Sequence, residues 1–243
     1  MRKLAIFVEG LTELGFIERL ISEIAGTHNI VFEKKRIVGG ATAPRQVISL
    51  EAARTSGTQK FYVLLYDCGG DHQVKPRIVE QHQSLSKSGF CSIIGLRDVR
   101  PNTSREDIPL LERNLKYGIK TSLIPVEIFL AVMEIEAWFL AESSHFEKID
   151  PGISLARIEI ALGFNPASGD MALRDEPTLD LDGVYLLGGK RYQKPGLATI
   201  QALDYSRMYL ELADKIVHFG NLVKSIDGFL TNGTEVHKAI ALS

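Results

Sequence analysis

Residues 4–13 read LAIFVEGLTE, and this stretch decides how the fold begins. The five apolar residues from Leu4 to Val8 predict a short buried strand, which ends at Glu9 and Gly10. Thr12 then stands before apolar residues at positions 16, 17, 20, 21 and 24, a spacing typical of one face of a helix. The sequence therefore predicts strand, turn and helix, with Glu9 at the carboxyl end of the strand.

The rest of the first half continues this alternation. Short apolar runs bounded by turn residues predict further strands at 28–38, 61–66 and 91–96. Helical spacing predicts helices at 44–54, 76–85 and 104–115, and residues 123–133 are expected to form a strand, or a strand and the start of a helix. Alternating strands and helices indicate an α/β fold with a mostly parallel sheet flanked by helices.

The second half has a different composition. Residues 165–182 are rich in Pro, Asp and Gly, which favours a long loop, and residues 198–230 predict one or two helices. We place the domain edge near residue 145. The expected organisation is an α/β domain over residues 1–145 and a mainly helical C-terminal extension over residues 146–243, packed on the first domain.

Composition restricts the function. The chain has 243 residues and a net charge of −2, so any polyanion must be held by local patches and metal ions. No apolar run approaches the roughly 20 residues that a membrane span needs, and a membrane partner is not expected. Cys68 and Cys91 are too few for a disulfide framework, which favours a cytoplasmic protein.

Acidic residues follow several of the predicted strands. Glu9, Asp67 and Asp98 stand at carboxyl ends, where open parallel sheets bind ligands. Converging carboxylates repel one another unless a divalent cation neutralises them, and Mg²⁺ or Mn²⁺ prefers such oxygen ligands. The predicted catalytic residues are Glu9, Asp67 and Glu136, and the predicted metal ligands are Glu9, Asp67, Asp71, Asp98 and Glu136.

Each of these acids also has a structural interpretation. Glu9 and Gly10 suit a plain strand-to-helix turn, and Asp67 before Gly69 and Gly70 suits a tight loop. Glu134 and Glu136 would share a face on a strand but lie about 200° apart on a helix, so only one of them is expected to enter a site if the segment is helical.

We choose Glu136, because the apolar Ala137 and Trp138 that follow it place it at the edge of the core, and a buried acid needs a partner. Its structural interpretation is an acid that caps a helix or pairs with Arg97.

Basic residues near these acids are candidates for nucleic-acid binding: Arg97, Arg100, Lys190, Arg191 and Lys194. Ion pairs within loops are the alternative for the two arginines beside Asp98. For residues 34–36, of sequence KKR, we favour a solvated face. The sequence around Lys190 lacks the spacing of a phosphate-binding P-loop, which excludes nucleotide hydrolysis of that kind.

The pair of strand ends resembles the Toprim domain of topoisomerases, primases and overcoming-lysogenization-defect nucleases. Glu9 matches the first-strand glutamate of that family, a metal ligand or general acid/base, and Asp67 matches the first aspartate of its D-x-D pair. Gly69 stands where the second aspartate is expected, so Asp71 or Asp98 would substitute for it.

A closer resemblance is to bacterial Toprim-like proteins, some paired with ATPases in defence islands, which share V-E-G-x-T-E at 8–13 and E-x-E-A at 134–137. That likeness also touches Lys190, Arg191 and Lys194. It implies a Mg²⁺- or Mn²⁺-dependent nuclease acting on phosphodiesters of DNA or RNA, in an anti-phage defence system with an ATPase partner. The alternatives are a non-catalytic Toprim-fold binding module of a larger complex, and phosphoryl or nucleotidyl transfer to a small molecule.

Overall fold

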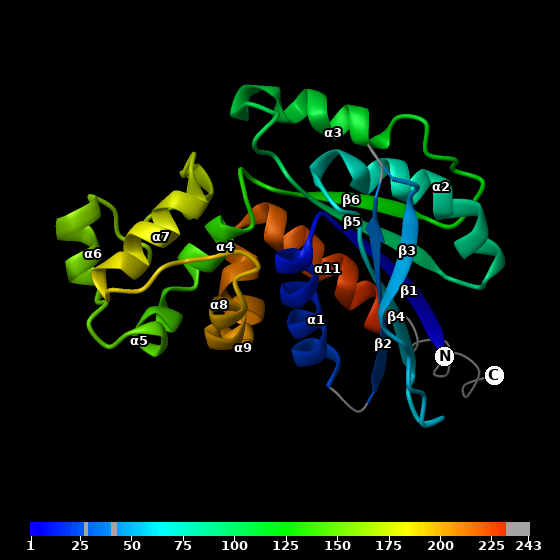
Figure 1. The fold of residues 1–243 in the computed structure, drawn as a ribbon, viewed down its shortest axis with the longest axis horizontal. Helices are drawn as coiled ribbons and strands as arrows, with labels where there is room; N and C mark the ends of the chain where they lie inside the picture. Colours follow the sequence, from blue (N-terminus) through cyan, green and yellow to red (C-terminus); the bar gives the residue numbers. More distant parts are fainter. Residues whose placement is uncertain (27–28, 40–42, 232–243) are drawn as a thin grey trace, which may run out of the picture.

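The computed structural model describes residues 1–26, 29–39 and 43–231, except the side chain of Asp71. A six-stranded sheet with the order β3-β2-β4-β1-β5-β6 forms its centre (Figure 1). All neighbouring strands are parallel except the pair β2 and β3. The strands are β1 (Arg2–Val8), β2 (Ile30–Val38), β3 (Gln46–Glu51), β4 (Phe61–Asp67), β5 (Ser92–Asp98) and β6 (Val126–Ala131).

The strand β1 lies inside the sheet, and residues 4–8 are buried, as a strand covered on both faces requires. Val8 pairs with Asp67, and Asp67 pairs in turn with Arg36, so these three residues form one row across β1, β4 and β2. Asp98 ends β5, the other neighbour of β1. The carboxyl ends of the parallel strands therefore meet along one edge of the sheet.

Helices cover both faces of the sheet (Figure 1). One face packs against α1 (Leu11–Ala25) and α11 (Val217–Thr231), and the other against α2 (Val74–Lys87) and α3 (Ile108–Lys116). Gly95 allows the close approach of α2, because a Cβ atom at this position would lie 2.9 Å from Ile78 Cδ1. The expected α/β fold with a mostly parallel sheet flanked by helices is confirmed.

The prediction of a helix at 44–54 was wrong. The structure has the strand β3 there, antiparallel to β2 and exposed along its whole length. Val47 and Ile48 are β-branched and fit a strand better than a helix, and the hairpin pairing with β2 provides the hydrogen bonds. Residue 28, the expected start of the second strand, lies outside the described residues.

The C-terminal part is mainly helical, as expected, but it has more elements than predicted. The short helix α4 (Glu136–Ala141) precedes it. Its own helices are α5 (Phe146–Ile149), α6 (Leu155–Leu162), α7 (Pro177–Leu187), α8 (Leu197–Ala202), α9 (Tyr205–Arg207), a π-helical segment (Met208–Leu212), α10 (Ala213–Lys215) and α11. The long loop predicted at 165–182 is shorter, because α7 begins at Pro177, a residue suited to the first turn of a helix.

The two halves of the chain share one hydrophobic core. Phe16 of α1 contacts Trp138 of α4 and Phe219 of α11, with ring centroids 6.0 and 6.3 Å away. The last helix thus returns to the sheet on which the chain began (Figure 1). The division at residue 145 stays a prediction. Across the described ranges, no helix combines the length and hydropathy needed to cross a membrane.

Candidate acidic site at the carboxyl edge of the sheet

Glu9 joins two neighbouring strands at the edge of the sheet. It follows β1 directly, it is 7% exposed, and its Oε1 accepts the backbone N–H of Asp98 at 2.9 Å. Gly10 then has extended backbone angles, and α1 begins at Leu11. Glu13 lies in the first turn of α1, where the free N–H groups of a helix favour negative charge.

Asp98 contacts the segment that precedes α4. Its Oδ1 accepts the backbone N–H of Ile135 at 3.1 Å, immediately before Glu136 begins α4. Met133, in the turn between β6 and α4, has a left-handed φ of 61°. That conformation costs about 1–2 kcal/mol for a residue with a side chain and is often found where a site must be held in place.

Glu136 is completely buried at the start of α4. Its Oε1 accepts a hydrogen bond from the Tyr192 hydroxyl at 2.7 Å and lies 3.1 Å from Lys194 Nζ. Its Oε2 is buried and has no hydrogen-bond partner within the described part of the chain. An unsatisfied buried carboxylate oxygen is costly and therefore marks a position where a further ligand would fit.

The charges of these acids influence one another. Burial, together with the negative charge of Glu136, raises the pKa of Glu13 to about 7. Burial and the charges of Glu13, Glu9 and Glu136 raise the pKa of Asp98 well above its usual value. Burial alone would lower the pKa of Lys194, but the surrounding carboxylates, Glu136 first, raise it. We call Glu9, Glu13, Asp98 and Glu136 the acidic cluster.

A cavity of about 350 Å³ opens onto this cluster. The beginning of α1, the end of β5 and the loop at Lys194 all contribute to its wall. Its lining includes Glu9, Gly10, Thr12, Glu13, Arg36, Asp98, Arg100, Glu134 and Lys194. Two of the predicted metal ligands, Glu9 and Asp98, line this cavity, and the charge of a third, Glu136, acts on Asp98 from the buried start of α4.

Asp67 is held differently. It is fully buried at the end of β4, its Oδ1 accepts the N–H of Gly69 at 2.9 Å, and its Oδ2 lies 3.0 Å from Arg36 Nε. The leading causes of the raised pKa values of Asp98 and Glu13 are burial and the charges of the acidic cluster. The predicted role of Asp67 as a metal ligand stays a prediction. The side chain of Asp71, another predicted ligand, lies outside the described part of the chain.

The five predicted nucleic-acid-binding residues occupy three places. Arg97 is buried away from the cavity, 3.5 Å from His72 Nδ1, and it does not pair with Glu136. Arg100 lines the cavity and contacts Glu176 and the carbonyl of Asp175. Lys194 lies within the acidic cluster.

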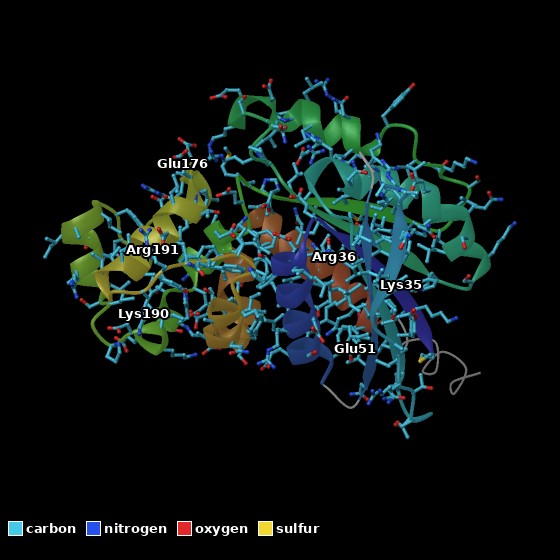
Figure 2. All side chains as sticks on the ribbon, viewed as in Figure 1. Lys35, Arg36, Glu51, Glu176, Lys190 and Arg191 are labelled. Carbon is cyan, nitrogen blue, oxygen red and sulfur yellow. The ribbon has the colours of Figure 1, made fainter. Side chains whose placement is uncertain are left out.

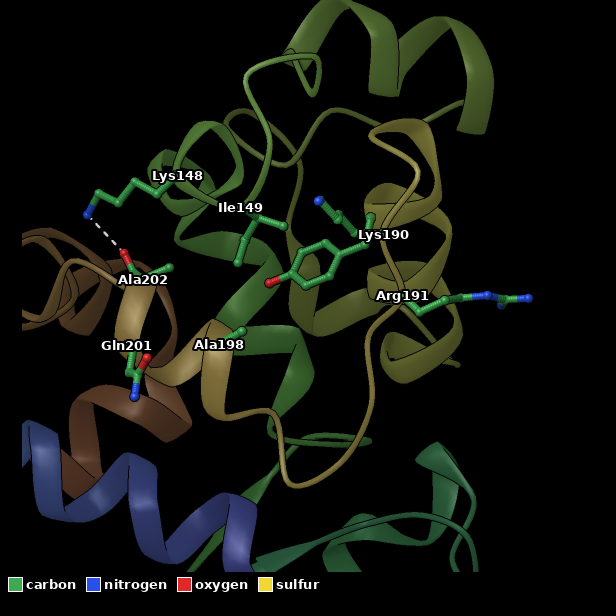
Figure 3. Close-up of a pocket in the computed structure, with 8 residues that line it drawn as sticks. Lys148, Ile149, Lys190, Arg191, Ala198, Gln201 and Ala202 are labelled. Atoms are coloured by element: carbon green, nitrogen blue, oxygen red, sulfur yellow. Dashed lines mark hydrogen bonds between the residues drawn. The ribbon is translucent and has the colours of Figure 1, made fainter.

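Lys190 and Arg191 line a separate cavity of about 570 Å³ with Lys148, Ile149, Gln201 and other residues of the helical part (Figure 3). Lys148 donates to the carbonyl of Ala202 across its wall, whereas Arg191 points away and pairs with Asp182. The loop from 188 to 196 therefore connects this basic cavity to Lys194 in the acidic cluster.

Sequence reasoning missed two residues of the site. Glu13 belongs to the V-E-G-x-T-E motif at 8–13 but was not predicted as a site residue, although it lies four positions after Glu9 and is 4% exposed. Tyr192, between Arg191 and Lys194, is buried and donates to Glu136. Four-residue spacing at a helix start was the available signal for Glu13, whereas no local pattern indicated the contact of Tyr192.

The chemistry of the cluster suits a hard divalent cation. Four carboxylates and one unsatisfied oxygen offer the ligand atoms that Mg²⁺ and Mn²⁺ prefer. Among the residues that the structure describes, however, no three Asp, Glu, His or Cys side chains already converge as a metal-binding group. The ammonium of Lys194 supplies a positive charge next to Glu136.

Comparisons with known proteins add little to this site. No protein-family profile and no curated protein matches the chain. Among solved structures, a presumed cell surface hydrolase from Lactobacillus plantarum WCFS1 is similar over 59% of this chain and 56% of that one, with 11% identity and a TM-score of 0.31. The match spans little more than half of that protein, and at this score it carries no argument about function.

Proposed function

We propose that the chain is a Toprim-type, Mg²⁺- or Mn²⁺-dependent nuclease that hydrolyses phosphodiesters of DNA or RNA. The observation that carries the proposal is the acidic cluster, in which Glu9, Glu13 and Asp98 line one cavity and the buried Glu136 has an Oε2 without a hydrogen-bond partner among the described residues. Burying acids together is unfavourable, so their presence at a ligand-binding edge favours a function over a structural role.

In this proposal Glu9, Asp98 and Glu136 hold the cation, and Glu13 completes the negative wall. A divalent ion at such a site would activate a water molecule and stabilise the leaving oxygen of a phosphodiester. Tyr192 and Lys194 hold Glu136 Oε1, and Oε2, which has no hydrogen-bond partner among the described residues, would be the atom that reaches the cation. The hydrogen bonds from the N–H groups of Asp98 and Ile135 fix the other two carboxylates.

The biological setting is proposed from the resemblance of residues 8–13 and 134–137 to Toprim-like proteins. It includes an ATPase partner and a role in anti-phage defence. A cytoplasmic location is proposed because Cys68 and Cys91 are both free thiols, which suits a reducing compartment. The basic cavity at Lys190 and Arg191 supports a nucleic-acid substrate, because the same loop reaches the acidic cluster.

The second candidate is a non-catalytic binding module. Lys194 favours it, because its ammonium already neutralises part of the cluster, as a structural ion pair would. In that case the cavity would bind a partner, and added metal would change neither stability nor activity.

Cleavage assays separate the two candidates. We expect the purified chain to cleave single-stranded DNA, double-stranded DNA or RNA in Mn²⁺ or Mg²⁺, and to lose this activity in a chelator. Glu106→Gln is the matched control, because Glu106 is an exposed acid outside the cavity and its loss should leave the rate unchanged. The absence of cleavage of every substrate, both alone and with neighbouring gene products, would favour the binding module.

A further inference from the structure

Arg36 lines the acidic cavity, as Lys194 does. The sequence KKR at 34–36 predicts a solvated face, but all three side chains are only partly exposed, from 16% for Lys34 to 39% for Arg36. Lys34 pairs with Glu18 and Glu51, and Lys35 pairs with Glu33. Arg36 instead lines the cavity beside Glu9 and Asp98, at the end of β2 that faces the beginning of α1 (Figure 2).

The guanidinium of Arg36 is held by one atom only. Its Nε lies 3.0 Å from Asp67 Oδ2, in an ion pair whose angles are not those of a straight hydrogen bond. Within the described part of the chain, its terminal nitrogens make no hydrogen bond or ion pair. The side chain is 39% exposed. Two parallel N–H donors on a planar group match the geometry of a phosphate.

Asp67 explains why Arg36 holds this position. Asp67 is fully buried, and burial raises its pKa, whereas the N–H of Gly69 and the charge of Arg36 oppose that increase. Arg36 and Asp67 are direct neighbours in the parallel register of β2 and β4, so their side chains point to the same face. A buried carboxylate with a single cationic partner is a strong positional restraint on that partner.

The negative charge of the cavity explains why an arginine at its rim would help to bind a phosphate. The acidic cluster repels a polyanion, so a phosphate needs positive groups at the rim. Arg100 lies at the rim, but Glu176 and the carbonyl of Asp175 already occupy it. Both of these contacts use Arg100 Nη1, whereas neither terminal nitrogen of Arg36 has a partner among the described residues.

We propose that Arg36 is a phosphate-binding subsite at the rim of the acidic cavity and that Asp67 is its positioning residue. The use of this subsite in cleavage rests on the proposed nuclease function, whereas its binding of phosphate does not. The shared ligand chemistry is a phosphate group, in a nucleic-acid backbone or as the free ion.

The test is a calorimetric titration of inorganic phosphate and, separately, of a short single-stranded DNA in Mg²⁺. We expect Arg36→Ala to weaken both by about tenfold to a hundredfold, the range for hydrogen bonds between charged groups. Lys35→Ala is the control, since its neighbouring side chain points to the other face, and it should leave the phosphate affinity within about twofold. Unchanged phosphate affinity in Arg36→Ala, or no phosphate binding by the wild type, would overturn the subsite.

Because Arg36→Ala leaves a buried carboxylate unpaired, the Arg36→Ala/Asp67→Asn double variant is measured beside it, with folding checked by circular dichroism. Asp67→Asn should weaken phosphate binding when Arg36 is present and change nothing when it is absent. Additive effects would exclude a positioning role.

The outcomes also separate this proposal from the nuclease proposal. Phosphate binding through Arg36 without any cleavage of nucleic acid would support the subsite proposal and contradict the nuclease proposal. Cleavage by Arg36→Ala with the wild-type KM would support the nuclease proposal and contradict the subsite proposal.

Discussion

Glu9→Gln is expected to reduce metal-dependent cleavage by about a thousandfold or more, because losing a metal ligand removes several kcal/mol of transition-state stabilisation at about 1.36 kcal/mol per factor of ten. The substitution removes one charge at nearly constant volume. The amide oxygen of Gln can still accept the N–H of Asp98, the contact that Glu9 Oε1 makes at 2.9 Å. The fold should therefore survive, and circular dichroism with a thermal melt checks it.

The matched control for this experiment is Glu106→Gln, which removes the same charge from an exposed position outside the cavity. It distinguishes a loss of cleavage caused by removing Glu9 from an effect of the change in net charge. Cleavage by Glu9→Gln at the wild-type rate would place the chemistry elsewhere in the molecule.

Glu13→Gln should make the metal-free protein more stable, by about 1–3 kcal/mol at about pH 8. Its folded-state pKa is about 7 against a usual 4.5, because burial and the charge of Glu136 disfavour ionisation. Below the unfolded pKa the group is neutral in both states, and no penalty exists. Between the usual pKa of 4.5 and the folded-state pKa of about 7, the cost of ionising the buried carboxyl grows with pH. The folded protein therefore loses stability as the pH rises, and the loss is complete above about pH 7.

Urea denaturation in a chelator at about pH 8 and about pH 4 measures this difference. The gain from Glu13→Gln should appear at the higher pH and vanish at the lower one. If Glu13→Gln were instead less stable at the higher pH, the ionised Glu13 would stabilise the fold, and the acidic cluster would not be destabilised by its charge. A stabilised variant that has lost activity would show that the acid is retained for function at a cost to the fold.

Much of the fold could be predicted from the sequence, because the signals were local. Apolar runs that end at Glu9, at Asp67 and just before Arg97 and Asp98 identified three neighbouring strands and the edge at which they end. Helical spacing identified α1 and α2 in the same way. The strand β3 was missed because its exposed residues give no burial pattern, and its existence depends on pairing with β2.

The site was predictable only in part. Glu136 was chosen from its apolar neighbours Ala137 and Trp138, and the structure places it fully buried in the cluster. The roles of Asp67 and Lys194 depend on contacts between residues that are distant in sequence, Asp67 with Arg36 and Lys194 with Glu136. Such contacts follow from strand order and from the path of the 188–196 loop, and neither has a local signature.

The most direct test of the central claim is calorimetric titration of the wild-type protein with Mn²⁺, accompanied by thermal melts. If the acidic cluster is a cation site, Mn²⁺ should bind with measurable heat and raise the melting temperature, because a ligand that binds only the folded state stabilises it. Asp98→Asn should abolish both effects, and Glu106→Gln should leave both unchanged. No heat and no thermal shift at millimolar Mn²⁺ or Mg²⁺ in the wild type would contradict the account.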